Sequence, residues 1–333
     1  MKAFAYVNAT NEKEALAALS DGVTGRPVRG RFLPIAGGMD VLGLMKDYVA
    51  QPERLINVKG LDATIGVTPD GGLRIGASVR LADLIEHAGA AKMYPALIRA
   101  AEEVGTPQIK NVGTVGGNIN QRPRCWYFRN EEFHCLKKGG DRCFAVDGEN
   151  QYHAIFGDGP CHIVHPSNLA VPIIAYAGRF RVVGPSGERE VDAGEFFEMP
   201  DRNMFAENVL APNELVTHVL LPSAAQMKSA TYEVRFKQAH DWPLGLASVV
   251  LAMNGDTVRS ARVVLGSVAP IPWRAPAAEA VLTGKKIDEA VATAAGEAAV
   301  QDAKPMRDNG YKVQIAKTAV KRAILQAVGI GTA

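Results

Sequence analysis

The chain has 333 residues, of which 47% are hydrophobic, and it carries 37 lysines and arginines against 35 aspartates and glutamates. This length predicts two or three domains, while the near-neutral charge and the lack of a basic block in the sequence argue against a nucleic-acid partner. No window of about 18 apolar residues occurs, so no membrane span is expected.

The first 60 residues alternate between short apolar strands and helical stretches. Glu14 follows Asn11 by three residues, which is a capping-box pattern at the start of a helix. Asp40 is a candidate N-cap for the next helix. The β-α-β-α-β order favours a small, mainly parallel sheet, with strands at 4–7, 31–35 and 54–58 and helices at 12–19 and 41–48.

The middle of the chain carries clear turn signals between apolar stretches. The Pro-Asp-Gly-Gly sequence at 69–72 predicts a hairpin within 64–79. A Gly-Pro-Ser-Gly sequence predicts a second hairpin, joining 180–183 to 188–191. Apolar spacing predicts helices at 81–87, 95–104 and 168–177.

The pattern changes after Pro222, where strands precede a run of helices, and this favours a separate α+β domain. Strands are predicted at 230–237, 246–253 and 260–268, and helices at 275–283, 288–299 and 313–328. We therefore divide the chain into 1–60, 61–222 and 223–333, with a polar, loop-rich insertion at about 121–165.

Two glycine-rich turns are candidates for phosphate binding. Gly37 and Gly38 lie between a predicted strand and a predicted helix, and the sequence 111–120 contains three glycines and a threonine. Glycine lets a ligand approach backbone N–H groups closely, and a helix N-terminus favours an anion. An ordinary strand–helix turn and a bulged strand are the structural alternatives. Because both turns lie in the first two of these three parts, before the C-terminal domain, we expect them to meet in space and to face one phosphate-containing ligand.

All four cysteines fall in one segment, spaced as Cys125-x9-Cys135-x7-Cys143-x17-Cys161. An iron–sulfur cluster needs four thiolates and tolerates wide spacing. Zinc also takes four thiolates, but its ligands usually come in C-x2–4-C pairs. Two disulfides are less expected in a chain with no secretory signal, and an isolated cysteine is often a small buried hydrophobe. The spacing alone leaves these alternatives open.

Aromatic residues and histidines crowd the same segment. Four aromatic residues lie near the first two cysteines, namely Trp126, Tyr127, Phe128 and Phe133. They could shield a cluster from water or form a small satellite core. Four histidines are expected to be structural or to support the ligands, namely His134, His153, His162 and His165.

The two glycine motifs resemble those of a known family. Leu33-Pro34-Ile35-Ala36-Gly37-Gly38-Met39-Asp40-Val41 is similar to the first FAD motif, and Gly113-Thr114-Val115-Gly116-Gly117-Asn118-Ile119 to the second, of the FAD-binding subunit of the xanthine dehydrogenase family of molybdenum hydroxylases. The resemblance covers essentially the whole chain, including Phe236-Lys237-Gln238-Ala239 and the terminal region with Arg307 and Tyr311. It implies an α+β protein: a two-part vanillyl-alcohol-oxidase-type FAD-binding domain, then a carbon-monoxide-dehydrogenase-flavoprotein-type C-terminal domain.

The same resemblance implies the residues that hold FAD. Residues 33–41 would contact the pyrophosphate and adenosine end, and Thr114, Gly117 and Asn118 the phosphate and ribityl groups. Asn168 stands where the family usually has an aspartate that hydrogen-bonds the flavin's sugar-alcohol chain, and Met39 replaces the usual threonine. Val216 matches a backbone-contact position, and Lys237 matches a lysine near the isoalloxazine. The following sequence 240–243 departs from the family pattern, and it could line an acceptor entrance or form a structural turn.

The cysteine segment is similar to an insertion found in a subgroup of these subunits. That subgroup includes the flavin subunits of periplasmic aldehyde oxidoreductase and of 4-hydroxybenzoyl-CoA reductase. The match runs from Gln121 to the sequence His165-Pro166-Ser167-Asn168. It implies a [4Fe–4S] cluster whose ligands are Cys125, Cys135, Cys143 and Cys161.

The function that the resemblance implies is electron transfer by one subunit of a complex. A large molybdopterin subunit would oxidise an aldehyde, purine or aromatic substrate, a small subunit with two [2Fe–2S] centres would pass the electrons on, and FAD would deliver them to an external acceptor. A stand-alone flavoprotein oxidase and a zinc-stabilised binding protein without flavin are the alternatives. The N-terminal sequence shows no secretory signal, so the cytoplasm is expected, with co-export to the periplasm on a partner's signal as the other location.

Overall fold

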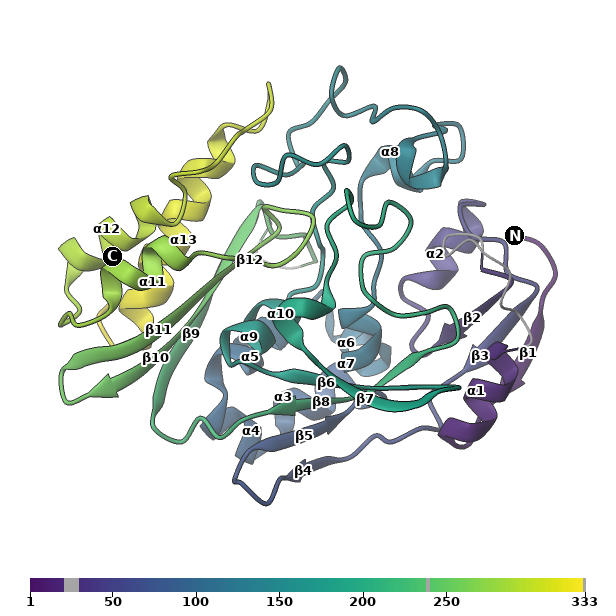
Figure 1. Cartoon of the computed structure of the whole chain (residues 1–333), viewed down its shortest axis with the longest axis horizontal. Helices are drawn as coiled ribbons and strands as arrows, with labels where there is room; N and C mark the ends of the chain where they lie inside the picture. The colour runs from purple at the N-terminus through teal and green to yellow at the C-terminus, as the bar shows by residue number, and fades with distance from the viewer. Residues whose placement is uncertain (21–29, 238–239, 332–333) are drawn as a thin grey trace.

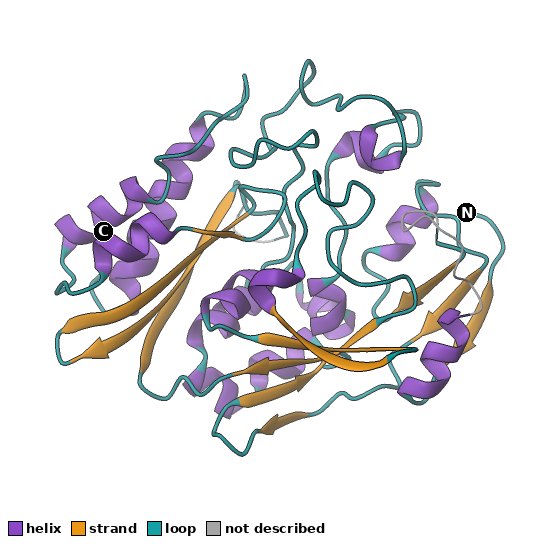
Figure 2. Ribbon diagram, viewed as in Figure 1, coloured by secondary structure: helices purple, strands orange, loops and turns teal. Residues whose placement is uncertain are grey.

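The structure is a computed structural model that describes residues 1–20, 30–237 and 240–331. Three sheets succeed one another across the molecule, and the cysteine segment lies over them as a set of loops between the two ends of the fold (Figure 1; Figure 2). Both helices and mainly antiparallel sheets are present, which confirms the predicted α+β class. No helix among the described residues is long and apolar enough to cross a membrane.

The N-terminal unit is a three-stranded parallel sheet in the order β1-β3-β2, as the alternating pattern predicts. The Glu14 N–H donates to Asn11 Oδ1 at 2.9 Å, while the Glu14 carboxylate accepts from the Thr10 N–H at 2.8 Å, one residue earlier than the capping box predicts. The elements are β1 (Ala5–Asn8), α1 (Glu12–Ser20), β2 (Phe32–Ile35), α2 (Val41–Lys46) and β3 (Arg54–Asn57).

The second sheet has five antiparallel strands in the order β4-β5-β8-β6-β7. Both predicted hairpins are confirmed, but the central strand β8 (Leu215–Leu221) is not among the sequence-based predictions. The other strands are β4 (Ile65–Val67), β5 (Leu73–Gly76), β6 (Arg179–Gly184) and β7 (Gly187–Asp192). The helices packed with this sheet are α3 (Leu81–Glu86), α4 (Ala88–Met93), α5 (Pro95–Glu102), α6 (Pro107–Val112), α7 (Val115–Ile119), α9 (Ala170–Ala175) and α10 (Ala193–Phe196).

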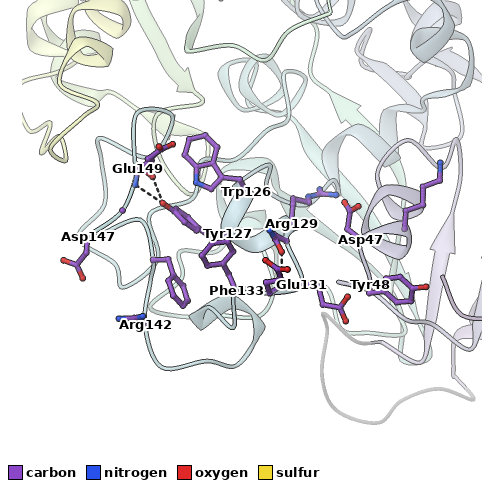
Figure 3. Close-up of a pocket in the computed structure, with 15 residues that line it drawn as sticks. Asp47, Tyr48, Trp126, Tyr127, Arg129, Glu131, Phe133, Arg142, Asp147 and Glu149 are labelled. Carbon is purple, nitrogen blue, oxygen red and sulfur yellow. Dashed lines mark hydrogen bonds between the residues drawn. The ribbon is translucent and has the colours of Figure 1, made fainter.

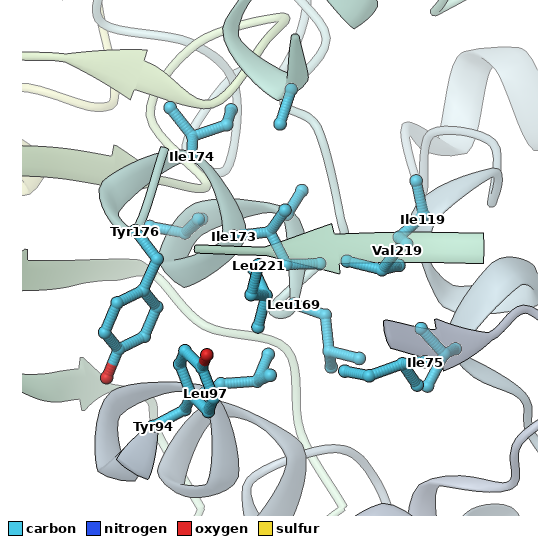
Figure 4. Packing of buried hydrophobic residues seen from close by; sticks show 14 of the residues in the cluster. Ile75, Tyr94, Leu97, Ile119, Leu169, Ile173, Ile174, Tyr176, Val219 and Leu221 are labelled. Atoms are coloured by element: carbon cyan, nitrogen blue, oxygen red, sulfur yellow. The ribbon is translucent and has the colours of Figure 1, made fainter. Parts of the chain in front are cut away.

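The core of this unit lies between the five-stranded sheet and the helices that cover it (Figure 4). Tyr94 and Tyr176 meet edge to face with their ring centroids 5.1 Å apart. Each buried phenol keeps a hydrogen-bond partner, as buried tyrosines generally do. The Tyr94 hydroxyl donates to the Pro222 carbonyl at 2.9 Å, and the Tyr176 hydroxyl bonds to Ser229 at 2.5 Å. The first bond reaches the end of this unit, and the second reaches across to the C-terminal unit.

The C-terminal unit is a four-stranded antiparallel sheet in the order β12-β11-β10-β9. Alternate residues of β10 enter different cores: Leu246 and Val250 face the first core, whereas Val249 and Leu251 face a second one that includes α13. Because β10 is buried on both faces, it belongs to both cores and connects the second unit with the C-terminal unit. The elements are β9 (Met227–Val234), β10 (Gly245–Asn254), β11 (Thr257–Gly266), β12 (Trp273–Arg274), α11 (Pro276–Leu282), α12 (Glu289–Ala298) and α13 (Tyr311–Ala327).

The cysteine segment contains little regular structure, as expected, apart from α8 (Trp126–Arg129) and the short 3-10 helix η2 (Leu136–Lys138). The C-terminal unit holds it through Lys312, whose buried ammonium donates to the carbonyls of Tyr152, His153 and Ser267 at 2.7–3.1 Å. Three carbonyl acceptors satisfy the three N–H donors of an ammonium group. The loops of the segment are therefore anchored to α13 and to the end of β11.

Candidate functional site

The two glycine-rich turns lie directly against each other. A Cβ atom placed on Gly37 would lie 2.0 Å from the Val112 carbonyl oxygen, so only glycine fits where the first turn meets the second. Gly38 has a φ of +75°, in the left-handed region that favours glycine. The sequence-based expectation that the two turns meet in space is confirmed.

Replacing Gly37 by alanine is expected to destabilise the protein by about 1–3 kcal/mol, the usual cost of overpacking. Val112 would have to move, because the new Cβ would collide with its backbone rather than with a flexible side chain. Gly43 in α2 is the matched control, since its Cβ would meet nothing nearer than 3.8 Å. Alanine there gains up to about 1 kcal/mol of helix propensity. Urea unfolding followed by circular dichroism compares the two variants, and equal unfolding free energies would contradict the prediction.

The second turn is a short helix, which corrects the expectation of a glycine-rich turn. Thr114 is its N-cap, and the Thr114 hydroxyl oxygen accepts from the Gly117 N–H at 3.1 Å. A Cβ on Gly116 would lie 2.8 Å from that of Ala77, so the helix packs on the residue that follows β5. Two adjacent glycines have low helix propensity. The hydrogen bond of the Thr114 cap and the close packing on Ala77 stabilise the helix despite this low propensity.

Asp40 ties the first turn to the start of the cysteine segment. Its carboxylate accepts from the backbone N–H of Arg122 at 2.9 Å and pairs with Arg124 at 2.8 Å and with Arg129 at 2.5 Å. Asp40 occupies the predicted N-cap position of α2, but its side chain makes no capping bond to the helix. Bonds to two guanidinium groups are stronger than a bond to a neutral backbone donor. The guanidinium of Arg124 also lies over the Trp242 ring, 4.6 Å from its centroid.

Asn118 joins the second turn to the segment that contains Asn168. Its side-chain oxygen accepts from the Ser167 hydroxyl at 2.7 Å and from the Leu169 N–H at 3.4 Å. Asn168 lies between Ser167 and Leu169 in the sequence, and its side chain is buried. Its amide nitrogen donates to Glu233 of β9 at 2.6 Å. The structure thus brings Asn118 and Asn168 together with a carboxylate that the sequence analysis did not single out.

Val216 and Lys237, the two remaining candidates, lie in different settings. Val216 is buried in β8. The carbonyl of the next residue, Thr217, accepts the Ala77 N–H at 2.7 Å, and the Ala77 carbonyl accepts the Gly116 N–H at 2.9 Å, so this strand is linked to the second turn through Ala77. Lys237 is exposed, and its backbone N–H donates to Asp241 at 3.0 Å. No hydrogen bond or ion pair of the described residues joins the Lys237 side chain to either turn. The adjoining motif residues Gln238 and Ala239 lie outside the described residues.

All four cysteines line one small internal cavity. Cys143 and Cys161 are close enough for a hydrogen bond, which lowers the pKa of Cys143 to about 5 and raises that of Cys161. Burial raises the pKa of the Cys125 thiol to about 12. The full lining is Cys125, Tyr127, Phe128, Cys135, Leu136, Lys137, Cys143, Phe144, His153, Cys161 and Ile163. Residues far apart in the segment are therefore brought around one mainly apolar space.

The four thiols are free and form no disulfide in the structure. Within the described ranges, no three histidine, cysteine, aspartate or glutamate side chains converge closely enough to hold a single metal ion. A zinc site needs its ligands at one point, about 2.3 Å from the ion for sulfur. A four-iron cluster instead takes its four thiolates on separate irons.

The surrounding rings enclose the cavity. Tyr127 and Phe128 line it, and Phe133 packs on Tyr127 with ring centroids 5.0 Å apart. His153 is buried, and its Nε2 lies 3.2 Å from Cys125 Sγ, while its Nδ1 has no partner among the described residues. Burial lowers the pKa of His153 to about 4, so the ring is neutral near pH 7. His153 therefore lies beside the candidate ligand Cys125.

A buried charge cluster holds the segment from the other side, and sequence reasoning missed it. Glu207 accepts from Arg122 at 2.7 Å and pairs with Lys137 at 2.7 Å, and both Lys137 and Glu207 are nearly inaccessible to solvent. Lys137 also donates to the Met204 carbonyl at 3.0 Å. The position of Lys137 between two cysteines could have marked it as a candidate from the sequence. Its partner Glu207 could not be found in this way, because it lies 70 residues further along the chain.

The outer face of the segment forms an open groove against the end of α2 (Figure 3). Tyr127 and Phe144 line both this groove and the cysteine cavity. Trp126 and Phe133 lie beside them on the groove wall (Figure 3). Its rim carries exposed acids, including Glu131. The aromatic residues singled out in the sequence therefore also form part of the wall of a surface groove.

Comparisons with known proteins agree with this architecture. A family model described as "FAD binding domain in molybdopterin dehydrogenase" matches residues 2–224, and a model of the "CO dehydrogenase flavoprotein C-terminal domain" matches residues 230–327. The aldehyde oxidoreductase FAD-binding subunit PaoB of Escherichia coli is 34% identical over 98% of this chain and 99% of its own length. The carbon monoxide dehydrogenase medium chain of Hydrogenophaga pseudoflava is 28% identical over 87% of each chain. A solved structure of that organism's carbon monoxide dehydrogenase, lacking the Mo-pyranopterin moiety, matches with a TM-score of 0.77 and 27% identity over 98% of both chains.

Proposed function

The chain belongs to the family of FAD-binding subunits of molybdopterin dehydrogenases, and on that premise we propose that it is the FAD- and [4Fe–4S]-containing electron-transfer subunit of a heterotrimeric molybdenum hydroxylase. The observation that carries the proposal is the joined pair of glycine turns with a four-cysteine cavity beside them. Arg124 spans the two, because it pairs with Asp40 of the first turn and directly precedes Cys125.

The proposed FAD site uses the backbone of the first turn and the start of α7. Residues 33–41 would hold the pyrophosphate and adenosine end, where glycine allows close approach to N–H groups. Met39 offers no hydroxyl, so backbone donors carry this part of the site. Thr114, Gly117 and Asn118 would hold the phosphate and ribityl groups, with Asn168 and the Val216 backbone further along and Lys237 near the isoalloxazine. Bound FAD would supply the two-electron redox chemistry.

The proposed cluster site uses Cys125, Cys135, Cys143 and Cys161. The fit rests on four thiols around one apolar cavity, which excludes water from a redox centre. Bound [4Fe–4S] would supply a one-electron carrier close to the flavin. His153 would orient Cys125 by a hydrogen bond to its sulfur, and the charge of Lys137, which also lines the cavity, is balanced by its ion pair with Glu207.

The proposed partners are a large molybdopterin subunit and a small subunit with two [2Fe–2S] centres. The large subunit would oxidise an aldehyde, a purine or an aromatic substrate, and its electrons would reach this chain through the small subunit. An external acceptor would then take them from this chain. The names of the relatives, an aldehyde oxidoreductase subunit and a carbon monoxide dehydrogenase medium chain, support a multi-subunit oxidoreductase. The proposed location is the cytoplasm, with co-export on a partner's signal as the alternative.

Co-expression with the genes that flank it tests the proposal. We expect two further subunits to copurify, and the visible spectrum of the complex to show flavin bands near ~450 nm with a broad iron–sulfur shoulder. A yellow protein that purifies alone would favour the stand-alone flavoprotein oxidase. A colourless protein containing zinc would overturn the proposal in favour of a zinc-stabilised binding protein.

A further inference from the structure

Lys137 is a buried lysine in the short helix η2, between Cys135 and Cys143. Its side chain is 1% exposed, and its ammonium pairs with Glu207 at 2.7 Å and donates to the Met204 carbonyl at 3.0 Å. Lysine is rarely fully buried unless it is paired, and apolar residues of the same volume often stabilise a protein more than a buried ion pair does. A methionine would fill this space without the cost of burying a charge. The charge itself therefore needs an explanation.

The ion pair of Lys137 and Glu207 belongs to a group of three residues with a net positive charge. The Glu207 carboxylate also accepts two bonds from the Arg122 guanidinium, at 2.7 and 2.9 Å, so two cations share it. Burial opposes ionisation of Glu207, but the two cations lower its pKa to about 2, so it is ionised near pH 7. Lys137 lines the cysteine cavity, whereas Glu207 does not. The cavity therefore faces a positive member of this group.

The other described residues that line the cavity include no aspartate and no glutamate to oppose this charge. Much of the wall is apolar, with Phe128, Leu136, Phe144 and Ile163 among its residues. A unit charge acts more strongly in such a space than at the surface, where water and salt screen it. A [4Fe–4S] cluster held by four thiolates would be an anionic centre here, and one-electron reduction would make it more negative by one charge.

We infer that Lys137 raises the reduction potential of the [4Fe–4S] cluster, because its buried positive charge stabilises the reduced, more negative state. The inference rests on the proposed function, in which the four cysteines hold that cluster. Glu207 and the Met204 carbonyl keep the ammonium of Lys137 in place, so its field on the cavity is fixed. Lys137 is thus a residue that tunes the cluster through space, as charges beside other metal centres do.

The test is a redox titration of the purified complex, in which dithionite donates one electron to each cluster and low-temperature EPR follows the reduced form. Lys137→Gln removes the charge but keeps a donor for the Met204 carbonyl. At a fixed solution potential it should lower the ratio of reduced to oxidised cluster about tenfold, the lower end of the effect of one nearby opposite charge. For one electron this is a shift of about 59 mV to more negative potential. Lys137→Arg keeps the charge, and its ratio should stay within about threefold of the original.

Lys138→Gln is the matched control, because Lys138 is the next residue, is only partly buried and does not line the cavity. Water screens its charge, so its removal should change the ratio by less than about twofold. The [2Fe–2S] centres of the proposed small subunit should keep their potentials in every variant.

The direction of the shift separates the charge of Lys137 from a structural role. A loosened cavity admits water, which favours the more highly charged reduced state, so a merely structural Lys137→Gln would raise the potential. A raised or unchanged potential would overturn the inference, and so would equal shifts in Lys137→Gln and Lys137→Arg. Loss of iron from Lys137→Gln would also overturn it, because Lys137 would then serve to retain the cluster. A parent complex with no [4Fe–4S] signal and no iron beyond that of its [2Fe–2S] centres would instead refute the proposed function.

Discussion

Replacing Cys143 by serine is expected to remove the iron from the purified protein and to leave its FAD in place. The original chain should carry about four iron atoms with matching acid-labile sulfide, because each thiolate holds one iron of a [4Fe–4S] cluster. Cys143 lines the cysteine cavity, whereas the turns around Gly37 and Thr114 form a separate contact. Iron and sulfide assays, together with FAD released by denaturation, measure both cofactors in one sample.

Val146→Ser is the matched control for this experiment. Val146 lies three residues further on in the same segment, its side chain is exposed, and it does not line the cavity. We expect the control to keep its full iron content. Full iron content in Cys143→Ser would exclude this cysteine as a ligand. Loss of FAD together with iron would show instead that the segment also supports the flavin pocket, contrary to the independence expected here.

Replacing Glu207 by glutamine is expected to destabilise the protein by about 3–5 kcal/mol, the effect of breaking a buried ion pair from one side. Arg122 and Lys137 would both lose their shared counter-charge, and Lys137 has almost no access to water. Because Lys137 lies between Cys135 and Cys143, the loss should also loosen the cysteine cavity. Denaturant unfolding gives the change in free energy, and the reactivity of the thiols in the iron-free protein reports on the cavity.

Glu190→Gln supplies the comparison, because Glu190 pairs with Arg179 at 2.7 Å on the surface, with both side chains about half exposed. Its removal should cost at most about 1 kcal/mol, as for other exposed pairs. Similar free-energy changes in the two variants would show that burial of the Glu207 cluster contributes nothing to stability.

The same cluster predicts a stability change in acid. Burial opposes ionisation of Glu207, but Arg122 and Lys137 outweigh it and lower its pKa to about 2 from an ordinary 4.5. Since the unfolded chain then binds the proton more readily, this contribution to stability is complete above pH 4.5 and is lost as the pH falls toward 2. Unfolding free energies measured across this range should fall less steeply for Glu207→Gln than for the original chain, and parallel curves would contradict the assignment.

Local patterns were sufficient for most elements but failed where distant residues decide the outcome. The parallel N-terminal sheet and both hairpins follow from short-range signals, because turn residues and apolar alternation act within a few positions. Asp40 is one such case. It precedes α2 as predicted, but its carboxylate binds three arginines of the cysteine segment and no N–H group of the helix. The helix at 115–119 shows it again, because its packing on Ala77 overrides the low helix propensity of two glycines.

The sequence by itself determined the class of the protein and the residue types of its candidate sites. Two glycine motifs and four cysteines are local facts, and their resemblance to a family needs no coordinates. Only the tertiary structure decided that Gly37 touches Val112, that four separated cysteines surround one cavity, and that Glu233 meets Asn168. The first and last of these contacts join residues from different units of the chain, the cysteines come from distant points of one segment, and no local propensity encodes any of the three. Burial of apolar residues holds those units together, because Leu215 of β8 is buried in one cluster with Ile56 and Leu246 of β10 is buried in another with Leu169.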